Sequence, residues 1–302
     1  MAEISRQWQK LTEEEFLRVD DEFLGSFRAP GSKNKFVAWD PFERSSRYFK
    51  FLLFTTAQRQ SPRFFEAYGK LHHRDLGRPL TVRCGGCDID ADYLAAVEEW
   101  EFLREARALE GTRTIVEIGA GFGRTCHTLI TLCPEIEEYI IVDLEPMLRL
   151  SRAYLQRVAP GANIRFISND DVTTLETFCP DLAINIDSFQ EMPPPVIDFY
   201  MTHVVQRATR FYCKNPVGKY SPEAVGRPDL STSQLLDVFH LGYCQNVLDI
   251  FNDEELNAAR TAFLTAYCPP PVRHGSKEEA YSVAQSKIMD LFPYFLHVLY
   301  TR

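Results

Sequence analysis

The feature that most constrains this chain is a glycine-rich turn that directly follows an apolar run. Residues 115–125 read Ile-Val-Glu-Ile-Gly-Ala-Gly-Phe-Gly-Arg-Thr. The apolar start predicts a buried strand, and the residues beyond the turn predict a helix. Glycine allows a tight turn and a close approach of the backbone to a ligand at the N-terminus of that helix. The segment therefore predicts a strand–turn–helix unit that binds a ligand.

Apolar runs alternate with helical patterns over residues 113–216. Buried strands are expected at 114–118, 139–142, 164–167, 182–186 and 211–213. Helices are expected between them, at 124–133, 146–158, 172–178 and 195–207. Such alternation is typical of a doubly wound, mainly parallel α/β sheet.

The segments on either side of residues 113–216 lack this alternation of strand and helix patterns. Residues 1–110 read as helices and loops, with an amphipathic helix over 93–103, and predict a mainly helical cap or lid. Its aromatic residues can line a pocket or form the core of the cap itself. The cofactor-binding domain is expected to span residues 111–302. Its tail is expected to hold helices at 235–239 and 253–266 and a strand at 294–300.

Composition narrows the partners of this chain. It has 302 residues and a net charge of −9, which disfavours binding to a phosphate backbone. No apolar run reaches the roughly 18 residues that a membrane-spanning helix needs, and the N-terminus lacks the apolar core of a signal peptide. We therefore expect a cytoplasmic protein that binds neither nucleic acid nor membrane. Self-association into a homo-oligomer stays open.

Eight cysteines are spread along the chain. Most lie in apolar runs, where cysteine behaves as a small hydrophobic residue. Cys84 and Cys87 form one CxxC pair. A structural zinc site would need a second pair, and only His72 and His73 are near in sequence. The favoured interpretation is a loop that carries two reduced or buried thiols.

The spacing of the glycines separates two classes of nucleotide-binding protein. A dinucleotide fingerprint has the pattern G-x-G-x-x-G, whereas the glycines here are Gly119, Gly121 and Gly123. Arg124 stands where the third glycine of that fingerprint would allow a helix to pack closely on a strand. A dehydrogenase is therefore disfavoured. A G-x-G-x-G turn after an acidic residue, here Glu117, resembles instead the cofactor loop of class I methyltransferases.

Polar residues follow the next two expected strands. Asp143 ends the second run, and its carboxylate can accept hydrogen bonds from both ribose hydroxyls of a nucleoside. Glu145 is the rival for that role, and Asp143 can also cap a helix. In class I methyltransferases a polar residue after the third strand meets the adenine amino group. Asn169 or Asp170 can do so here, or can cap the next helix.

With these residues in place, the chain resembles the sugar O-methyltransferases, a bacterial group of class I enzymes. The resemblance is carried by Tyr93-Leu94 with its helix and by segments 116–124, 140–148, 186–192 and 211–216. It implies a Rossmann-like methyltransferase fold and S-adenosyl-L-methionine as the cofactor. One departure is Glu145, between Leu144 and Pro146, which can take the ribose contact from Asp143. The implied cofactor contacts are Glu117, Gly119, Ala120, Gly121, Gly123, Asp143, Leu144, Asn169, Asp170 and Asn185.

Methyl transfer to a hydroxyl needs an aligned nucleophile and a base near the fourth strand, where the methyl group projects. Asp187 and Glu191 follow that strand and would share a face if the turn is helical. Either carboxylate can be the base, or both can hold a divalent metal such as Mg²⁺ that lowers the pKa of a sugar hydroxyl. Alternatively, Asp187 can simply cap a helix while Glu191 lies in solvent. His240 is the imidazole alternative.

Gln190, Lys214 and Asn215 are expected to bind the acceptor, because the ends of the fourth and fifth strands face the same crevice. We therefore expect an O-methyltransferase that acts on a sugar or a glycosylated natural product, a hydroxyl-rich small molecule. One alternative is methyl transfer to a nitrogen or phenol of another small molecule. Another is a catalytically inactive partner subunit that only binds the cofactor.

Overall fold

The computed structural model describes residues 45–226, 239–274 and 277–302. The chain divides into two units, residues 1–55 and 56–302. Helix α3 (Ser45–Gln58) crosses this division, and every other described element belongs to the second unit. The tail helix expected at 235–239 lies, except for Phe239, outside the described residues. The domain boundary expected at residue 110 stays a prediction.

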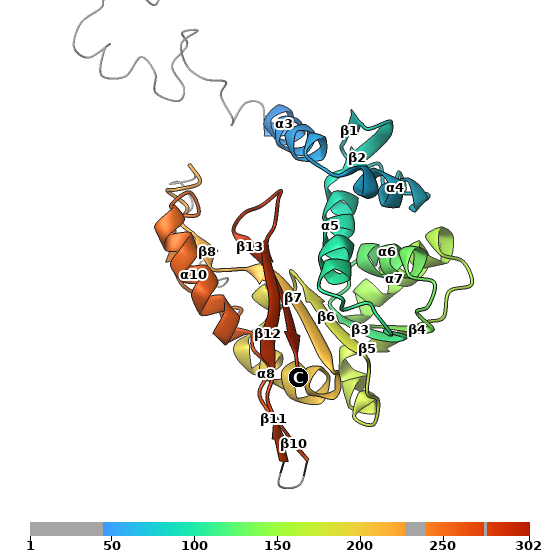
Figure 1. Cartoon of the computed structure of the whole chain (residues 1–302), viewed down its shortest axis with the longest axis vertical. Coiled ribbons are helices and arrows are strands. Elements are labelled where there is room, and N and C mark those ends of the chain that lie inside the picture. The colour runs from blue at the N-terminus through green and yellow to red at the C-terminus, as the bar shows by residue number, and fades with distance from the viewer. Residues whose placement is uncertain (1–44, 227–238, 275–276) are drawn as a thin grey trace, which may run out of the picture. The chain divides into compact units, whose positions relative to one another are not determined.

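A seven-stranded sheet forms the centre of the second unit (Figure 1), in the order β12-β13-β7-β6-β3-β4-β5. Within this sheet β13 runs antiparallel to the other six strands, which are parallel to one another. The strands are β3 (Thr114–Ile118), β4 (Glu138–Asp143), β5 (Ile164–Ser168), β6 (Leu182–Ile186), β7 (Arg210–Pro216), β12 (Ser282–Ile288) and β13 (Phe295–Thr301). The predicted Rossmann-like fold class and its five core strands are confirmed.

Of the two C-terminal strands, only one was predicted from the sequence. The apolar strand expected at 294–300 is confirmed as β13, which is buried along almost its whole length. Strand β12 was not predicted. It lies at the edge of the sheet and is mostly exposed, so its sequence lacks the apolar run by which a buried strand is found.

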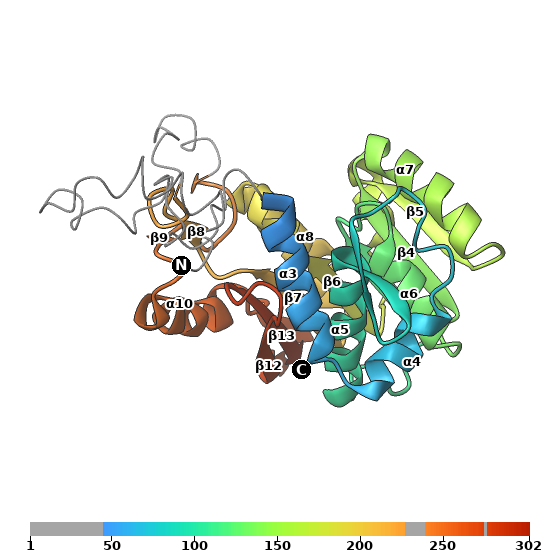
Figure 2. The ribbon, with the colours of Figure 1, turned by 90° about the horizontal axis from the view of Figure 1, so that it is seen from above.

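Helices cover both faces of the sheet (Figure 2). Residues of α8 (Pro194–His203) and α10 (Asp253–Ala266) share one buried cluster with one face. Helices α5 (Ala91–Glu105), α6 (Arg124–Leu132) and α7 (Glu145–Val158) pack on the other. Helices α5, α6, α7 and α10 confirm predicted helices, and α8 confirms the first part of the helix expected at 195–207. Among the described residues, no helix is long and apolar enough to cross a membrane.

Two expected helices differ from prediction. The segment 172–178 is not an α-helix, because a 3-10 helix, η1 (Asn169–Leu175), begins directly after β5 at its cap Ser168. The helix expected at 195–207 breaks at Val204, whose backbone leaves the helical region at φ −120° and ψ −59°. It continues as the 3-10 helix η3 (Val205–Arg207). A further 3-10 helix, η2 (Phe189–Glu191), follows β6.

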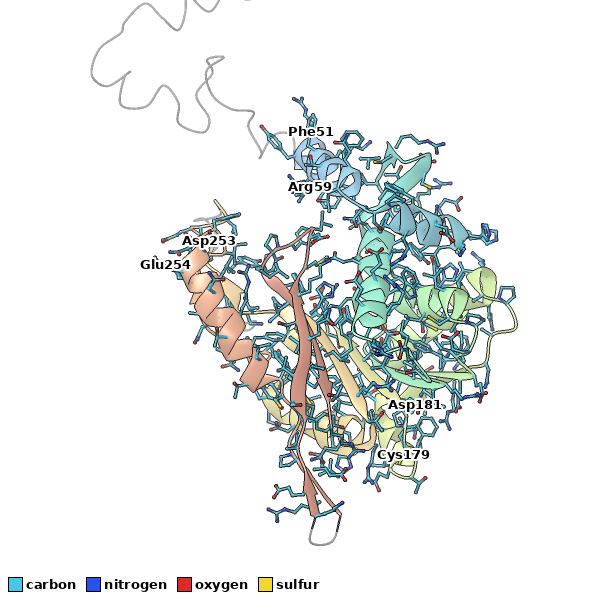
Figure 3. All side chains as sticks on the ribbon, in the orientation of Figure 1. Phe51, Arg59, Cys179, Asp181, Asp253 and Glu254 are labelled. Carbon is cyan, nitrogen blue, oxygen red and sulfur yellow. The ribbon has the colours of Figure 1, made fainter. Side chains whose placement is uncertain are left out.

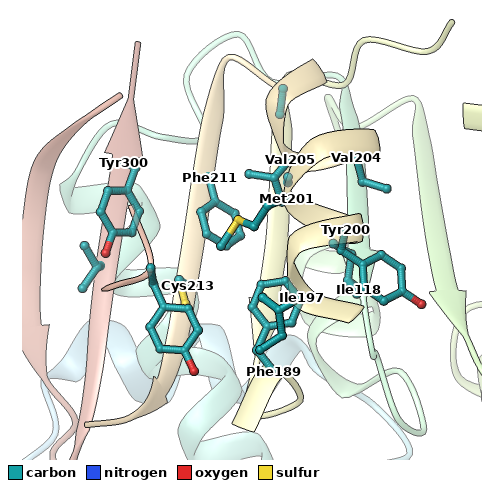
Figure 4. Close-up of a cluster of buried hydrophobic side chains, with 14 of the residues drawn as sticks. Ile118, Phe189, Ile197, Tyr200, Met201, Val204, Val205, Phe211, Cys213 and Tyr300 are labelled. Atoms are coloured by element: carbon teal, nitrogen blue, oxygen red, sulfur yellow. The ribbon is translucent and has the colours of Figure 1, made fainter. Parts of the chain in front are cut away.

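The core on the α8 side is rich in aromatic rings (Figure 4). Phe189 stacks on Tyr267 with ring centroids 6.2 Å apart and an interplanar angle of 8°. Phe211 of β7 stacks on Tyr300 of β13 in the same cluster. Because Phe189 belongs to η2, this packing fixes the turn that follows β6.

The expectation of helices and loops over residues 1–110 is wrong for one segment. A hairpin of β1 (Thr81–Cys84) and β2 (Cys87–Asp90) precedes α5. Gly85 and Gly86 form its two-residue turn with φ values of +56° and +77°, which suit the primed turns that match strand twist. The Gly-Gly pair was a readable hairpin signal.

The remaining elements are short. Helix α4 (Pro62–Lys70) is capped by Ser61, whose Oγ accepts a hydrogen bond from the Phe64 N–H. Strands β8 (Lys219–Tyr220) and β9 (Val247–Leu248) pair in parallel, and β10 (Val272–His274) and β11 (Lys277–Glu279) form an antiparallel pair. Asp181 accepts hydrogen bonds from the backbone N–H groups of Arg113 and Thr114, and thereby ties the start of β6 to the start of β3 (Figure 3).

A fully buried carboxylate joins α5 to two other elements. Glu99 accepts two hydrogen bonds of 2.9 Å from the guanidinium of Arg124, the first residue of α6. Lys214 Nζ of β7 lies 2.5 Å from Glu99 Oε1. The two cations hold the pKa of Glu99 down, at about 2, although burial opposes this. A buried ion pair of this kind ties elements together only while all its members are present.

We predict that Glu99→Gln destabilises the protein by about 3–5 kcal/mol, because two buried cations lose their counter-charge. Urea unfolding at pH 7 measures the loss. Since the folded pKa of Glu99 is depressed, its stabilisation is present above its ordinary pKa of 4.5 and is lost as the pH falls toward about 2. The difference in the free energy of unfolding between wild type and Glu99→Gln should therefore be smaller at pH 3 than at pH 7. Glu105→Gln, an exposed change on the same helix, should have little effect, and equal losses for both variants would contradict the prediction.

Candidate cofactor and acceptor site

The sheet has a reversal point between β3 and β6. From β3 the chain continues to β4 and β5 on one side, whereas β6 and β7 lie on the other. In open α/β sheets, ligands bind at such a point, in the crevice outside the carboxyl ends of the strands. The glycine loop follows β3 directly at this place, and the Gly119 N–H donates to the Val142 carbonyl of β4 over 2.8 Å.

Each glycine of the loop has a positive φ, which side chains rarely tolerate: +74° at Gly119, +58° at Gly121 and +94° at Gly123. A Cβ atom at Gly119 would lie 2.1 Å from Ser188 Oγ, and one at Gly123 would lie 2.8 Å from Leu155 Cδ1. No atom lies within 4 Å of a Cβ position at Gly121. Two glycines therefore allow close packing, and the third leaves open space beside the loop.

That open space is part of a cavity of about 520 Å³ at the carboxyl ends of the strands. Five of the predicted cofactor contacts line it, namely Gly119, Gly121, Asp143, Leu144 and Asn169. Apolar side chains complete one side: Leu144, Met147 and Val196 are 57%, 36% and 40% exposed. Such exposure of apolar groups inside a cavity is typical of a ligand site.

Asp143 occupies the tip of β4 inside this cavity. Its Oδ2 accepts a hydrogen bond from the Gly121 N–H over 3.1 Å, and its Oδ1 accepts one from the Leu144 N–H over 2.8 Å. Partial burial raises the pKa of Asp143 above its ordinary value, and the two backbone donors oppose this. Its carboxylate thus braces the glycine loop. The rival Glu145 is exposed in the first turn of α7 and is not part of the cavity lining.

The polar residues after β5 have different roles. Ser168 caps η1, with its Oγ accepting from the Asp170 N–H over 3.4 Å. Asn169 and Asp170 are therefore not the cap. Asn169 lines the cavity, whereas Asp170 is exposed beside it and accepts a hydrogen bond from Asn169 Nδ2.

Four other predicted cofactor residues do not line the cavity. Glu117 is buried in the sheet and accepts a hydrogen bond of 2.7 Å from Tyr139 Oη, and burial raises the pKa of Glu117 to about 7. Asn185 is fully buried and donates to the Ile118 carbonyl over 3.0 Å. Ala120 and Gly123 shape the loop. Direct contact of these four residues with a cofactor stays a prediction.

Asp187 begins the turn after β6 with a φ of +58°, a conformation that aspartate and asparagine tolerate better than most residues. Its N–H donates to the Lys214 carbonyl over 2.7 Å, and its side chain accepts a hydrogen bond from Gln190 Nε2. Although water reaches Asp187, the surrounding protein removes part of its hydration and raises its pKa to about 6, against the opposing charges of Lys214 and Arg124.

A second cavity, of about 320 Å³, lies against this turn. Glu191 lines both cavities, so the turn forms the wall between them. The second cavity combines polar and aromatic side chains. It is lined by Asp187, Gln190, Glu191, Pro216, Gly218, Lys219, Tyr220, Phe239, Tyr294 and Phe295.

The sequence did not indicate Lys219 as a site residue. Its side chain is only 9% exposed, and its Nζ donates to the Gln190 carbonyl over 3.0 Å. Burial lowers the pKa of Lys219. Lys219, Tyr220, Tyr294 and Phe295 come from segments outside the alternating strand–helix pattern, and no local motif marks them.

The structure places the remaining predicted residues differently. Lys214 is ion-paired with Glu99, and Asn215 is fully buried, with its Oδ1 accepting from the Gln190 N–H over 3.3 Å and its Nδ2 donating to Asn185 Oδ1 over 2.8 Å. Both support the turn from behind, and neither lines the second cavity. His240 is exposed, and its carbonyl accepts a hydrogen bond from Gln245 Nε2. Acceptor binding by Lys214 and Asn215 and catalysis by His240 stay predictions.

Metal binding also stays a prediction. Within the described ranges, no group of three or more histidine, cysteine, aspartate or glutamate side chains is placed to hold a metal ion. Asp187 and Glu191 form a pair close enough for the charge of Glu191 to raise the pKa of Asp187.

No family model matches the chain, and no curated protein matches it by sequence. Solved structures of similar fold include the mitomycin 7-O-methyltransferase MmcR, which is 12% identical with a TM-score of 0.41 over 78% of this chain and 60% of that chain. The pyocyanin biosynthetic protein PhzM is 13% identical with a TM-score of 0.42 over 79% and 61%. The methyltransferase domain of bacterial CtHen1 is 12% identical with a TM-score of 0.42 over 68% and 97%.

The chain thus spans about 60% of the length of MmcR and PhzM. With identities of 12–13% and TM-scores of 0.41–0.42, these similarities carry no argument about what this chain does. The function proposed for this chain therefore rests on its own residues.

We predict that Gly119→Ala destabilises the protein more than Gly161→Ala. Both positions have a positive φ, of +74° and +85°, so both variants carry a backbone strain of about 1–2 kcal/mol. Only at Gly119 would the new Cβ also meet another residue, Ser188, which adds about 1–3 kcal/mol. Urea unfolding of the two variants measures the difference, and equal losses would show that the contact with Ser188 is not close.

Proposed function

We propose that this chain is an S-adenosylmethionine-dependent methyltransferase. The observation that carries the proposal is the cavity at the reversal point of the sheet, which joins the glycine loop, the Asp143 carboxylate and an apolar wall. A nucleoside fits this set of groups. Asp143 would hold the ribose hydroxyls, Leu144, Met147 and Val196 would contact the adenine ring, and Asn169 would meet its polar edge.

Two features favour a single nucleoside over a dinucleotide. Arg124 stands at the position where a dinucleotide fingerprint needs its third glycine, and its guanidinium is directed to Glu99. The second half of the sheet also departs from the parallel six-strand dinucleotide order, because antiparallel β13 stands between β7 and β12.

The second cavity is suited to a hydroxyl-bearing acceptor. Carboxylates accept hydrogen bonds from hydroxyl groups, the lysine donates them, and aromatic rings offer flat apolar faces to a sugar or phenolic ring. Because Glu191 lines both cavities, an acceptor there would adjoin the cofactor. We therefore propose a sugar, or the sugar of a glycosylated natural product, as the acceptor, with a phenol of another small molecule as the alternative.

The cofactor supplies the activated methyl group when it is bound. This chain's own residues must hold the acceptor hydroxyl and remove its proton. Asp187 suits this role, because a carboxylate with a pKa of about 6 is ionised at neutral pH and still a better base than an ordinary aspartate. Gln190, whose amide donates to the Asp187 side chain, orients it. A Mg²⁺ ion shared by Asp187 and Glu191 would instead lower the pKa of the hydroxyl, and assays with and without a chelator separate the two routes.

The cofactor assignment predicts that S-adenosylhomocysteine binds and that NAD does not. Calorimetric titration of wild type, Asp143→Asn and Glu145→Gln tests it. Both variants remove one charge, and the amide introduced by Asp143→Asn keeps an acceptor for one of the two backbone N–H groups that Asp143 holds, those of Gly121 and Leu144. We expect Asp143→Asn to weaken binding by more than tenfold, about 1.4 kcal/mol, and Glu145→Gln by less than about threefold. Preferential binding of NAD would overturn the proposal, and a larger effect at Glu145 would move the ribose contact there.

The acceptor assignment predicts a pH profile for methyl transfer to a hydroxyl. Because Asp187 must be ionised to accept a proton, kcat/KM should rise with pH up to about 6 and then level off. Asp187→Asn keeps the tolerated positive φ and should lower kcat by about 10²- to 10⁴-fold. Asp253→Asn, an exposed change in the first turn of α10 (Figure 3), should leave the profile unaltered. Nearly full activity of Asp187→Asn would exclude it as the base.

A further inference from the structure

The hairpin before α5 places two cysteines opposite each other. Cys84 and Cys87 are direct partners in the antiparallel register of β1 and β2. Opposite residues project from the same face, with Cα atoms about 5.5 Å or less apart, which lies within the range that a disulfide spans. Both are free thiols in this structure.

The fold holds this pair in place before any bond forms. A Cβ at Gly85 would lie 2.4 Å from the ring of Phe65, so the tip of the hairpin packs closely on α4. At the other end, Tyr68 Oη donates to Asp90 Oδ2 over 2.8 Å and accepts from the Asp90 N–H over 3.0 Å. Because both ends are anchored, the two thiols stay paired in the folded protein.

The pair is also accessible. Cys84 and Cys87 are half-buried, whereas Cys126, Cys133 and Cys213 are buried. Cys87 lines a cavity of about 470 Å³ together with four cationic or titratable nitrogen side chains and three carboxylates. These are His72, His73, Arg74, Arg83, Asp75, Asp88 and Asp90. One of the cations, Arg83, is ion-paired with Asp88 over 3.2 Å. Arg74 Nη1 donates to the carbonyls of Tyr68 and Leu71. His72 and His73 are therefore the nitrogen side chains of this cavity that can donate to an anionic reagent near Cys87.

We propose that Cys84 and Cys87 form a reversible intrachain disulfide by exchange with a low-molecular-weight disulfide of the glutathione type. One cysteine thiolate attacks the reagent, forms a mixed disulfide and releases one thiol. The other thiolate then attacks the protein sulfur of that mixed disulfide, closes the Cys84–Cys87 bond and releases the second thiol. The protein dithiol loses two electrons and two protons, and the reagent is reduced to two thiols. This modification site is independent of the proposed methyltransferase activity.

Mass spectrometry of the reduced, full-length protein after equilibration with oxidised and reduced glutathione tests the proposal. Trypsin would release residues 84–104 as one peptide, because Arg83 and Arg104 bound a segment that contains no other Lys or Arg. In wild type, this peptide should become lighter by two hydrogen atoms and return to its first mass with dithiothreitol. In Cys84→Ser and Cys87→Ser, the remaining thiol should instead carry one glutathione. Cys179→Ser removes an exposed thiol elsewhere (Figure 3) and should leave the result unchanged.

Three outcomes would overturn the proposal. Wild type carrying glutathione on both cysteines would show that the thiols cannot reach each other. An unmodified peptide, under conditions that glutathionylate Cys179, would show that the pair is not accessible. Zinc that is bound stoichiometrically to the reduced protein, and lost in both serine variants, would make the pair a metal site instead.

Discussion

The structure around the crevice depends on one buried carboxylate. Glu99 of α5 holds Arg124, which directly follows the glycine loop, and Lys214, whose carbonyl accepts from the Asp187 N–H. Glu99 therefore connects the glycine loop to the turn after β6, on the face of the sheet that α5 covers. Removing two cations and a carboxylate from water is costly, and the geometry offsets this cost only if every partner is present. Such a network specifies one arrangement of α5, α6 and β7.

The sequence predicted the parts of the fold that bury an unbroken apolar run. Strand β4 contains such a run, and β3 and β6 are apolar apart from Thr114, Glu117 and Asn185, because both faces of a parallel sheet are covered by helices. Strand β12 was missed because it is a largely exposed edge strand. The β1–β2 hairpin was missed because its four-residue strands carry no clear apolar pattern, and its readable signal was the Gly85-Gly86 turn. The segment of η1 was expected as an α-helix because local pattern cannot distinguish a short α-helix from a 3-10 turn.

The sequence predicted cavity-lining residues only where they lie at the carboxyl ends of parallel strands. Gly119, Asp143 and Asn169 line one cavity because parallel strands present their carboxyl ends together. Lys214 was expected in the crevice for the same reason, but its side chain turns to the α5 face and pairs with Glu99. Lys219, Tyr294 and Phe295 reach the second cavity through tertiary contacts of the tail, which no local pattern contains.

The close packing of Ser188 on Gly119 fixes the shape of one part of the site, whereas the rim of the second cavity can be changed. Ser188 touches the glycine loop and receives a hydrogen bond from Asn185, so the loop and the turn of Asp187 and Glu191 form one rigid piece. The rim of the second cavity comes from other segments, including Tyr220 and Tyr294, which are less buried than Phe295 of β13. Under the proposed function, rim side chains could therefore be replaced to change the acceptor range without altering the glycine loop, and a library confined to the rim should keep the affinity for S-adenosylhomocysteine.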